Sequence, residues 1–134
     1  MGRKFLISAL VMFVMSTSLG FIVHGWMLHH DYAQLPHLFR PQQDMGHYFP
    51  FMLLANLLFA IAFAWIYLKG REGKPFLVQG IRYGVAIAVL TTIPVYLIYY
   101  AVQPMPGAMV LKQVVFDTIG VILMGVVLAW LNRK

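Results

Sequence analysis

Four long runs of apolar residues divide the chain, and short polar or proline-containing segments separate them. Crossing about 30 Å of hydrocarbon takes roughly 20 apolar residues in an α-helix. Each run reaches that length, and each is too long for a strand of a membrane barrel. The pattern therefore predicts four membrane-spanning helices, at about residues 5–28, 49–68, 76–102 and 110–131.

The connections predict how these helices are arranged. Those at about 69–75 and 103–108 are short, so the helices on either side of each should be antiparallel neighbours. The only long connection covers about residues 29–48. We expect an all-α fold, a four-helix transmembrane bundle in which residues 1–134 form a single integral membrane domain.

Small residues recur every four positions along three of the expected helices. Such stripes let helix backbones approach closely in lipid, where no hydrophobic force drives helices together. We expect all three stripes to face the interior of the bundle. They are Ser16, Gly20 and His24; Asn56, Ala60 and Ala64; and Gly80, Gly84 and Ala88.

The ten basic residues predict the orientation of the bundle. If the N-terminus lies inside, the outer side receives only Arg40 and Lys112, and the cytoplasmic side receives the other eight. This is the positive-inside bias of membrane proteins, so both termini should be cytoplasmic and the segment 29–48 should form an outer loop. The eight are Arg3, Lys4, Lys69, Arg71, Lys74, Arg82, Arg133 and Lys134.

Composition excludes several other classes of protein. Of the residues, 61% are hydrophobic and only 10% are charged, against about 25% charged in soluble domains. The chain has no cysteine, which excludes disulfide scaffolds, thiolate zinc sites and iron–sulfur clusters. The net charge of +6 comes from residues at the ends of apolar runs rather than from a basic surface, so we expect no nucleic-acid partner.

A cleaved signal peptide is the main alternative for the first apolar run. Arg3 and Lys4 precede an apolar stretch, and small residues follow at 16–18. The run nevertheless continues through Phe21, Ile22 and Val23, which favours a membrane span.

All five histidines lie between positions 24 and 47, at the outer end of the first helix and in the outer loop. Imidazole groups near methionines and aspartates suit zinc or copper, so one hypothesis is a metal site formed by His29, His30, His37 and His47. The alternative is that they are ordinary loop residues, because no standard metal-binding spacing is present. Adjacent histidines would also point about 100° apart on a helix.

Asp117 is the most informative single residue. A carboxylate inside a membrane helix costs about 2–3 kcal/mol on insertion and usually faces the interior of a bundle or a watery cavity. His24, Asn56 and Tyr96 should lie at similar depth on the other helices. We therefore predict a polar intramembrane cluster of His24, Asn56, Tyr96 and Asp117, which serves either as an ion, proton or small-ligand site or as interhelical glue.

The arrangement resembles small four-span bacterial inner-membrane proteins of unknown function. The stretches that carry the resemblance are His24-Gly25, 31–36 with 38–40, Tyr48-Phe49-Pro50 and 102–107. The resemblance implies a multi-pass protein of the bacterial inner membrane and brings no activity with it. Small multidrug-resistance transporters are also short and four-span, but the first helix here lacks their membrane-embedded glutamate.

Three functional hypotheses follow. The first is a non-enzymatic membrane protein whose outward-facing polar or histidine-rich site handles an ion or a metal, with zinc or copper as the candidate cofactor. The second is an accessory or structural subunit of a larger membrane complex or a homo-oligomer, whose small-residue stripes would be docking faces. The third is a metal-dependent membrane enzyme, which would need three histidine ligands and an open position on the metal.

Overall fold

The computed structural model describes residues 2–134, which are 84% helical and contain no strand. Four continuous helical stretches are long and apolar enough to cross a membrane: Gly2–Met27, Gln42–Gly70, Phe76–Val102 and Gly107–Leu131. The elements are α1 (Gly2–Gly20), η1 (Phe21–Met27), α2 (His29–Ala33), α3 (Gln42–Gly70), α4 (Phe76–Ile87), η2 (Ala88–Thr92), α5 (Ile93–Val102) and α6 (Gly107–Leu131).

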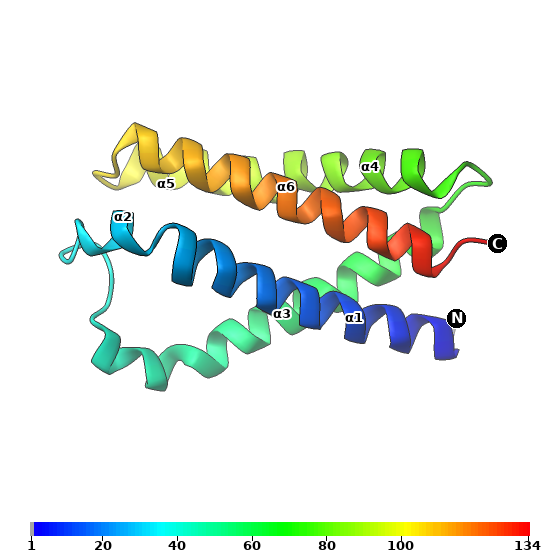
Figure 1. Ribbon diagram of the computed structural model, residues 1–134, viewed down its shortest axis with the longest axis horizontal. Coiled ribbons are helices and arrows are strands. Elements are labelled where there is room, and N and C mark those ends of the chain that lie inside the picture. Colours follow the sequence, from blue (N-terminus) through cyan, green and yellow to red (C-terminus); the bar gives the residue numbers. More distant parts are fainter. Residues whose placement is uncertain (1) are drawn as a thin grey trace.

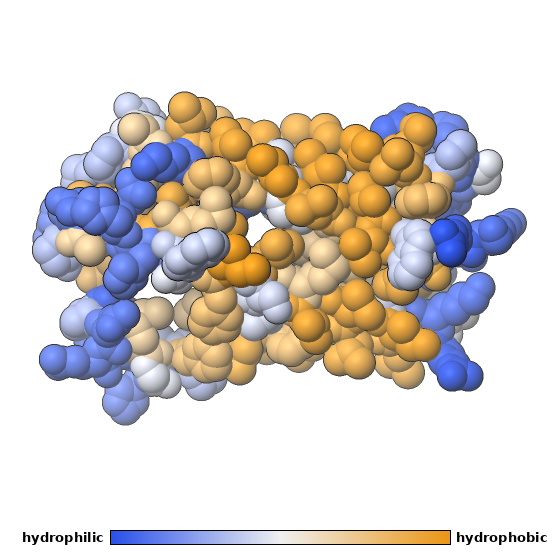
Figure 2. All heavy atoms as spheres, in the orientation of Figure 1, coloured by the Kyte–Doolittle hydropathy of each residue, from blue (hydrophilic) through white to orange (hydrophobic). Residues whose placement is uncertain are grey.

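The four stretches run back and forth along the long axis, and the N- and C-terminal ends lie at the same end of the molecule (Figure 1). A broad apolar band covers the middle, with hydrophilic residues gathered at both ends (Figure 2). The predicted all-α fold with four helices of membrane-spanning length is confirmed. The chain therefore has the architecture of a small multi-pass membrane protein.

The helix bounds differ from the predicted spans at the end of the molecule that holds residues 29–48, which we call the outer segment. Helix α3 begins at Gln42 rather than near residue 49, and α6 begins at Gly107 rather than near residue 110. Hydropathy locates only the part of a helix that meets hydrocarbon, so it misses the polar first turns of α3. The short helix α2 also forms within the predicted loop 29–48.

The closest helix packing joins α4 to α6 through glycines. A Cβ atom added at Gly80 would lie 2.6 Å from the Cα atom of Val126, and one at Gly84 would lie 2.5 Å from the Cα atom of Ile122. Both distances are far shorter than a carbon–carbon contact of about 3.5–4 Å. The glycines of the third stripe therefore allow two backbones to touch, as small residues do in membrane bundles.

The second stripe is buried at Ala60 and Ala64, whereas all three residues of the first stripe are only partly buried and Gly20 has open space beside it. Ala60 and Ala64 belong to the main core, together with Met12 and Phe63. Farther along the same two helices, the Ser16 hydroxyl donates a hydrogen bond to the side-chain carbonyl of Asn56. Polar and small residues thus join α1 to α3.

The third helical stretch is interrupted at its middle. The π-helical segment η2 comes just before Pro94, which has no N–H group for the helix. The Thr91 hydroxyl donates to the Ile87 carbonyl at 2.8 Å, so a side chain supplies a hydrogen bond near the break. The interruption leads into α5, which carries Tyr96.

Candidate functional site

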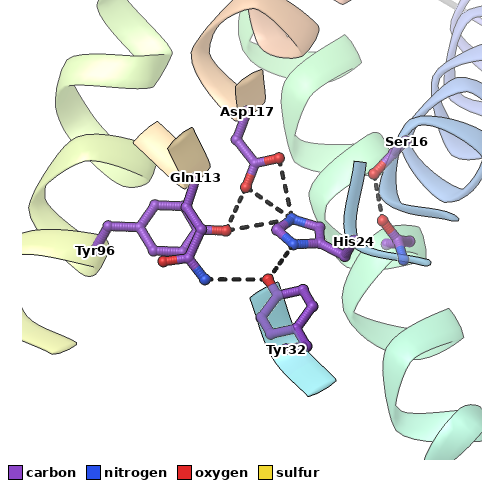
Figure 3. Close-up of polar contacts among 7 residues, drawn as sticks. Ser16, His24, Tyr32, Tyr96, Gln113 and Asp117 are labelled. Atoms are coloured by element: carbon purple, nitrogen blue, oxygen red, sulfur yellow. Dashed lines mark hydrogen bonds and ion pairs between the residues drawn. The ribbon is translucent and has the colours of Figure 1, made fainter. Parts of the chain in front are cut away.

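A π-helical segment positions His24. At its end the Leu28 N–H donates to the Val23 carbonyl at 2.8 Å, an i to i−5 hydrogen bond of π-helical type. A π-turn widens the helix and changes the direction of its side chains, and such turns occur often at functional sites. His24 lies within this segment, with 31% of its side chain exposed, and points toward α5 and α6 (Figure 3).

His24 meets the intramembrane carboxylate of Asp117. Its Nε2 atom lies 3.1 Å from Oδ1 and 3.0 Å from Oδ2 of Asp117, whose side chain is 22% exposed. The Tyr96 hydroxyl donates to Oδ2 of the same carboxylate and lies 3.4 Å from His24 Nε2. Three helical stretches therefore converge on one carboxylate, as Figure 3 shows.

On the Nδ1 side, His24 contacts Tyr32, and Tyr32 in turn contacts Gln113, two residues that the sequence reasoning missed. The Tyr32 hydroxyl oxygen, from α2, lies 2.5 Å from His24 Nδ1. The Gln113 amide donates to that hydroxyl at 3.1 Å. Gln113 precedes Asp117 by one helical turn on α6, a spacing that places both side chains on one face. That spacing was the available sequence signal for Gln113, whereas nothing local marked Tyr32.

One assignment of protons uses every donor in this chain of contacts. Because Gln113 donates to Tyr32, the Tyr32 O–H is free to donate to Nδ1 of a neutral His24. The proton on Nε2 then points at Asp117, which also accepts from Tyr96. A carboxylate with two donors is well satisfied, and this compensates for its position inside the membrane.

The same geometry accommodates a second proton on His24. Both ring nitrogens of an imidazolium are donors, so Nδ1 would donate to the Tyr32 oxygen. The Tyr32 O–H would then need an acceptor, and the Oε1 atom of Gln113 has no hydrogen-bond partner among residues 2–134. A flip of the Gln113 amide would present that oxygen to Tyr32. The contacts can therefore hold His24 in two protonation states.

The outer segment folds back to place Tyr32. A small core of Met105, Met109 and Val110 packs against Tyr32 and against apolar side chains of the same segment: Leu35, Leu38 and Phe39. Lys112 on α6 forms an ion pair with Asp31 at 3.1 Å. Burial, followed by the charges of Asp117 and Asp31, raises the pKa of Tyr32, so its hydroxyl stays protonated at neutral pH.

A cavity of about 400 Å³ adjoins the site between α1, η1, α3 and α6. His24 and Asp117 line it, and so does Asn56 on α3. The space-filling view is hollowed on the side where η1 and α3 separate (Figures 1 and 2). The histidine and the carboxylate therefore adjoin an open space large enough for several water molecules.

The structure separates the four residues of the predicted intramembrane cluster into two groups. His24, Tyr96 and Asp117 make direct contacts. Asn56 lines the cavity, but its amide bonds to Ser16 and to the Met52 carbonyl rather than to the other three. Similar depth in the membrane did not fix the direction in which Asn56 points.

The histidines of the outer segment are not gathered into a cluster in the described part of the chain. All four candidate residues are exposed, and residues 2–134 contain no group of three histidine, aspartate or glutamate side chains placed to hold a metal ion. The geometry therefore gives no support to zinc or copper binding by the four, which are His29, His30, His37 and His47.

Comparisons with protein families, curated proteins and solved structures find no match to this chain. The resemblance to small four-span bacterial membrane proteins is therefore without family evidence. The helices and the site define a small multi-pass membrane protein with a polar intramembrane centre.

Proposed function

We propose that this protein is a multi-pass protein of the bacterial inner membrane, with both termini cytoplasmic, that handles protons at His24 and Asp117. One observation carries the proposal: a single imidazole joins a membrane-embedded carboxylate on one side to Tyr32 on the other, beside a cavity. Ionisable residues inside a membrane helix mark ion pathways and proton relays.

The direction of the hydrogen bonds supports a role for the proton itself. A proton that reaches Asp117 or His24 from the cavity can leave His24 when Nδ1 gives a proton to the Tyr32 oxygen and the Tyr32 hydroxyl gives its own proton to solvent water. Histidine is suited to such exchange because its two nitrogens can hold one or two protons near neutral pH. In this proposal the bundle is a scaffold for a proton-coupled step.

The test is proton flux into liposomes that contain the purified protein, driven by a potassium diffusion potential and followed with a trapped pH-sensitive dye. Asp117→Asn keeps the size of the side chain and removes its titratable charge. Asp44→Asn, at the start of α3 and outside the site, is the matched control.

We expect the unaltered protein and Asp44→Asn to carry protons and Asp117→Asn to lose at least nine-tenths of the flux while still folding. If the unaltered protein carries none, the transport role is wrong. If Asp117→Asn carries protons at the normal rate and keeps normal stability, the cluster is interhelical glue.

A further inference from the structure

A second cavity, of about 550 Å³, lies at the opposite end of the bundle from His24. It is enclosed by the end of α3, the turn before α4 and the end of α6, close to the two ends of the chain in Figure 1. Its cationic lining residues are Arg71, Lys74, Arg133 and Lys134. This cavity therefore concentrates positive charge.

The charge of the lining is unbalanced. Glu72 is the only acidic side chain that lines the cavity, so the four cationic side chains and this one carboxylate have a summed side-chain charge of +3. Glu72 is already paired with Lys74 at 2.5 Å, and this hydrogen bond and charge lower the pKa of Glu72. Arg71, Arg133 and Lys134 have no acidic partner among residues 2–134.

Hydrogen-bond donors that line the cavity remain available to an anion. The Arg71 guanidinium uses one N–H for the Asn132 carbonyl, at 3.0 Å, and a guanidinium has five. Helix α4 begins at the cavity with no acidic residue in its first turn and, within the described residues, no side-chain cap. The positive end of that helix adds to the attraction for an anion.

The cavity lies at the depth of lipid headgroups. Trp65 on α3 and Trp130 on α6 are 50% and 46% exposed near the same end. The Lys69 ammonium lies 6.0 Å from the Trp65 ring, and the Arg133 guanidinium lies 5.0 Å from the Trp130 ring. Exposed tryptophans beside basic residues are typical of the membrane–water interface. A phosphate that enters this cavity is therefore most readily the headgroup of a lipid.

We propose that this cavity binds the phosphate of an anionic phospholipid. Basic pockets between membrane helices bind such headgroups, and each nearby Lys or Arg strengthens the attraction. The acyl chains would lie along the apolar surface of α3 and α6 below the two tryptophans. This site is separate from His24 and Asp117 and does not depend on the proton-handling role.

The test measures binding of phosphatidylglycerol to the full chain by native mass spectrometry, with phosphatidylcholine and inorganic phosphate as the comparison probes. The cavity variant is Arg133→Gln with Lys134→Gln. The matched control is Arg3→Gln with Lys4→Gln, which removes the same charge near the same end but away from the cavity lining.

We expect phosphatidylglycerol to bind the unaltered chain and the control alike, and the cavity variant about 30-fold more weakly, since two basic residues are removed. Equal weakening in both variants would mean general attraction to the basic end and would overturn the proposal. Equal binding of phosphatidylcholine, or full competition by inorganic phosphate, would also overturn it, because the site would then not select an anionic lipid.

Discussion

Replacing Tyr32 by phenylalanine tests how firmly the outer segment is tied to the intramembrane site. The change removes one oxygen atom and leaves the ring in the small core beside Met105 and Met109. That oxygen accepts from Gln113 and contacts His24 Nδ1. Phenylalanine therefore leaves two polar groups without their partner and changes little else.

The magnitude follows from the burial of those two groups. Gln113 is only 3% exposed, so its amide would remain unpaired, a loss of about 1–3 kcal/mol. The His24 side chain is 31% exposed and adjoins a cavity, so water can replace the hydroxyl at Nδ1. We expect Tyr32→Phe to lower the free energy of unfolding by about 1–3 kcal/mol, nearly all of it from Gln113.

The assay is equilibrium unfolding in mixed detergent micelles. Tyr99→Phe is the matched control, because Tyr99 is 46% exposed and should change stability by less than about 0.5 kcal/mol. A second comparison adds Gln113→Met to both backgrounds. Removing both partners of a buried hydrogen bond is often nearly neutral, so the double variant should be more stable than the sum of the single effects predicts.

The opposite outcome is that Tyr32→Phe matches Tyr99→Phe in stability, or that the effects of Tyr32→Phe and Gln113→Met simply add. Either result would mean that Tyr32 and Gln113 do not depend on each other in the folded protein.

Four further predictions concern the glycine contact, the ion pair, pH and orientation. Gly84→Ala should lower the free energy of unfolding in micelles by about 1–3 kcal/mol, because the added methyl group overpacks against α6. Gly20→Ala is the control and should not lower it, because there is open space around the Cβ position of Gly20. Asp31→Asn should leave unfolding of the bundle nearly unchanged but speed amide hydrogen exchange in α2, because the exposed pair with Lys112 is worth at most about 1 kcal/mol. Burial raises the pKa of Tyr32 in the folded protein above its ordinary value of 10.0. The stability that the protonated hydroxyl contributes is therefore complete below pH 10 and is lost as the pH rises through the higher folded pKa. Above pH 10, the free energy of unfolding should fall more steeply with pH in the unaltered protein than in Tyr32→Phe. A reporter active only in the periplasm should give a signal when inserted near Gln42 and none after Lys134, and the reverse pattern would overturn the orientation.

Hydropathy alone predicted most of the fold, because a membrane imposes a length and a composition on each span. The third stretch, Phe76–Val102, agrees with the predicted 76–102. The outer segment was less predictable, since its polar helices lie outside hydrocarbon and show no apolar run. The start of α3 at Gln42 and the helix α2 were missed for this reason.

The candidate site was partly predictable for a similar reason. Asp117 stood out because an intramembrane carboxylate is costly, and its need for partners indicated His24 and Tyr96, which the structure places beside it. Tyr32 could not be found this way, because it reaches the site only when the outer segment folds back over Met105 and Met109. Hydropathy does not encode that tertiary contact.

The two halves of the site differ in how firmly they are held. Asp117 lies on α6, whose backbone touches α4 at Gly80 and Gly84, so the carboxylate belongs to a tightly packed helix pair, and Tyr96 donates to it from α5, beyond the break at η2. His24 and Tyr32 come from the π-helical segment and from the short helix α2, which a small core and an exposed ion pair hold. Local opening favours regions with few buried contacts. A change of protonation at His24 should therefore move η1 and α2 more readily than Asp117.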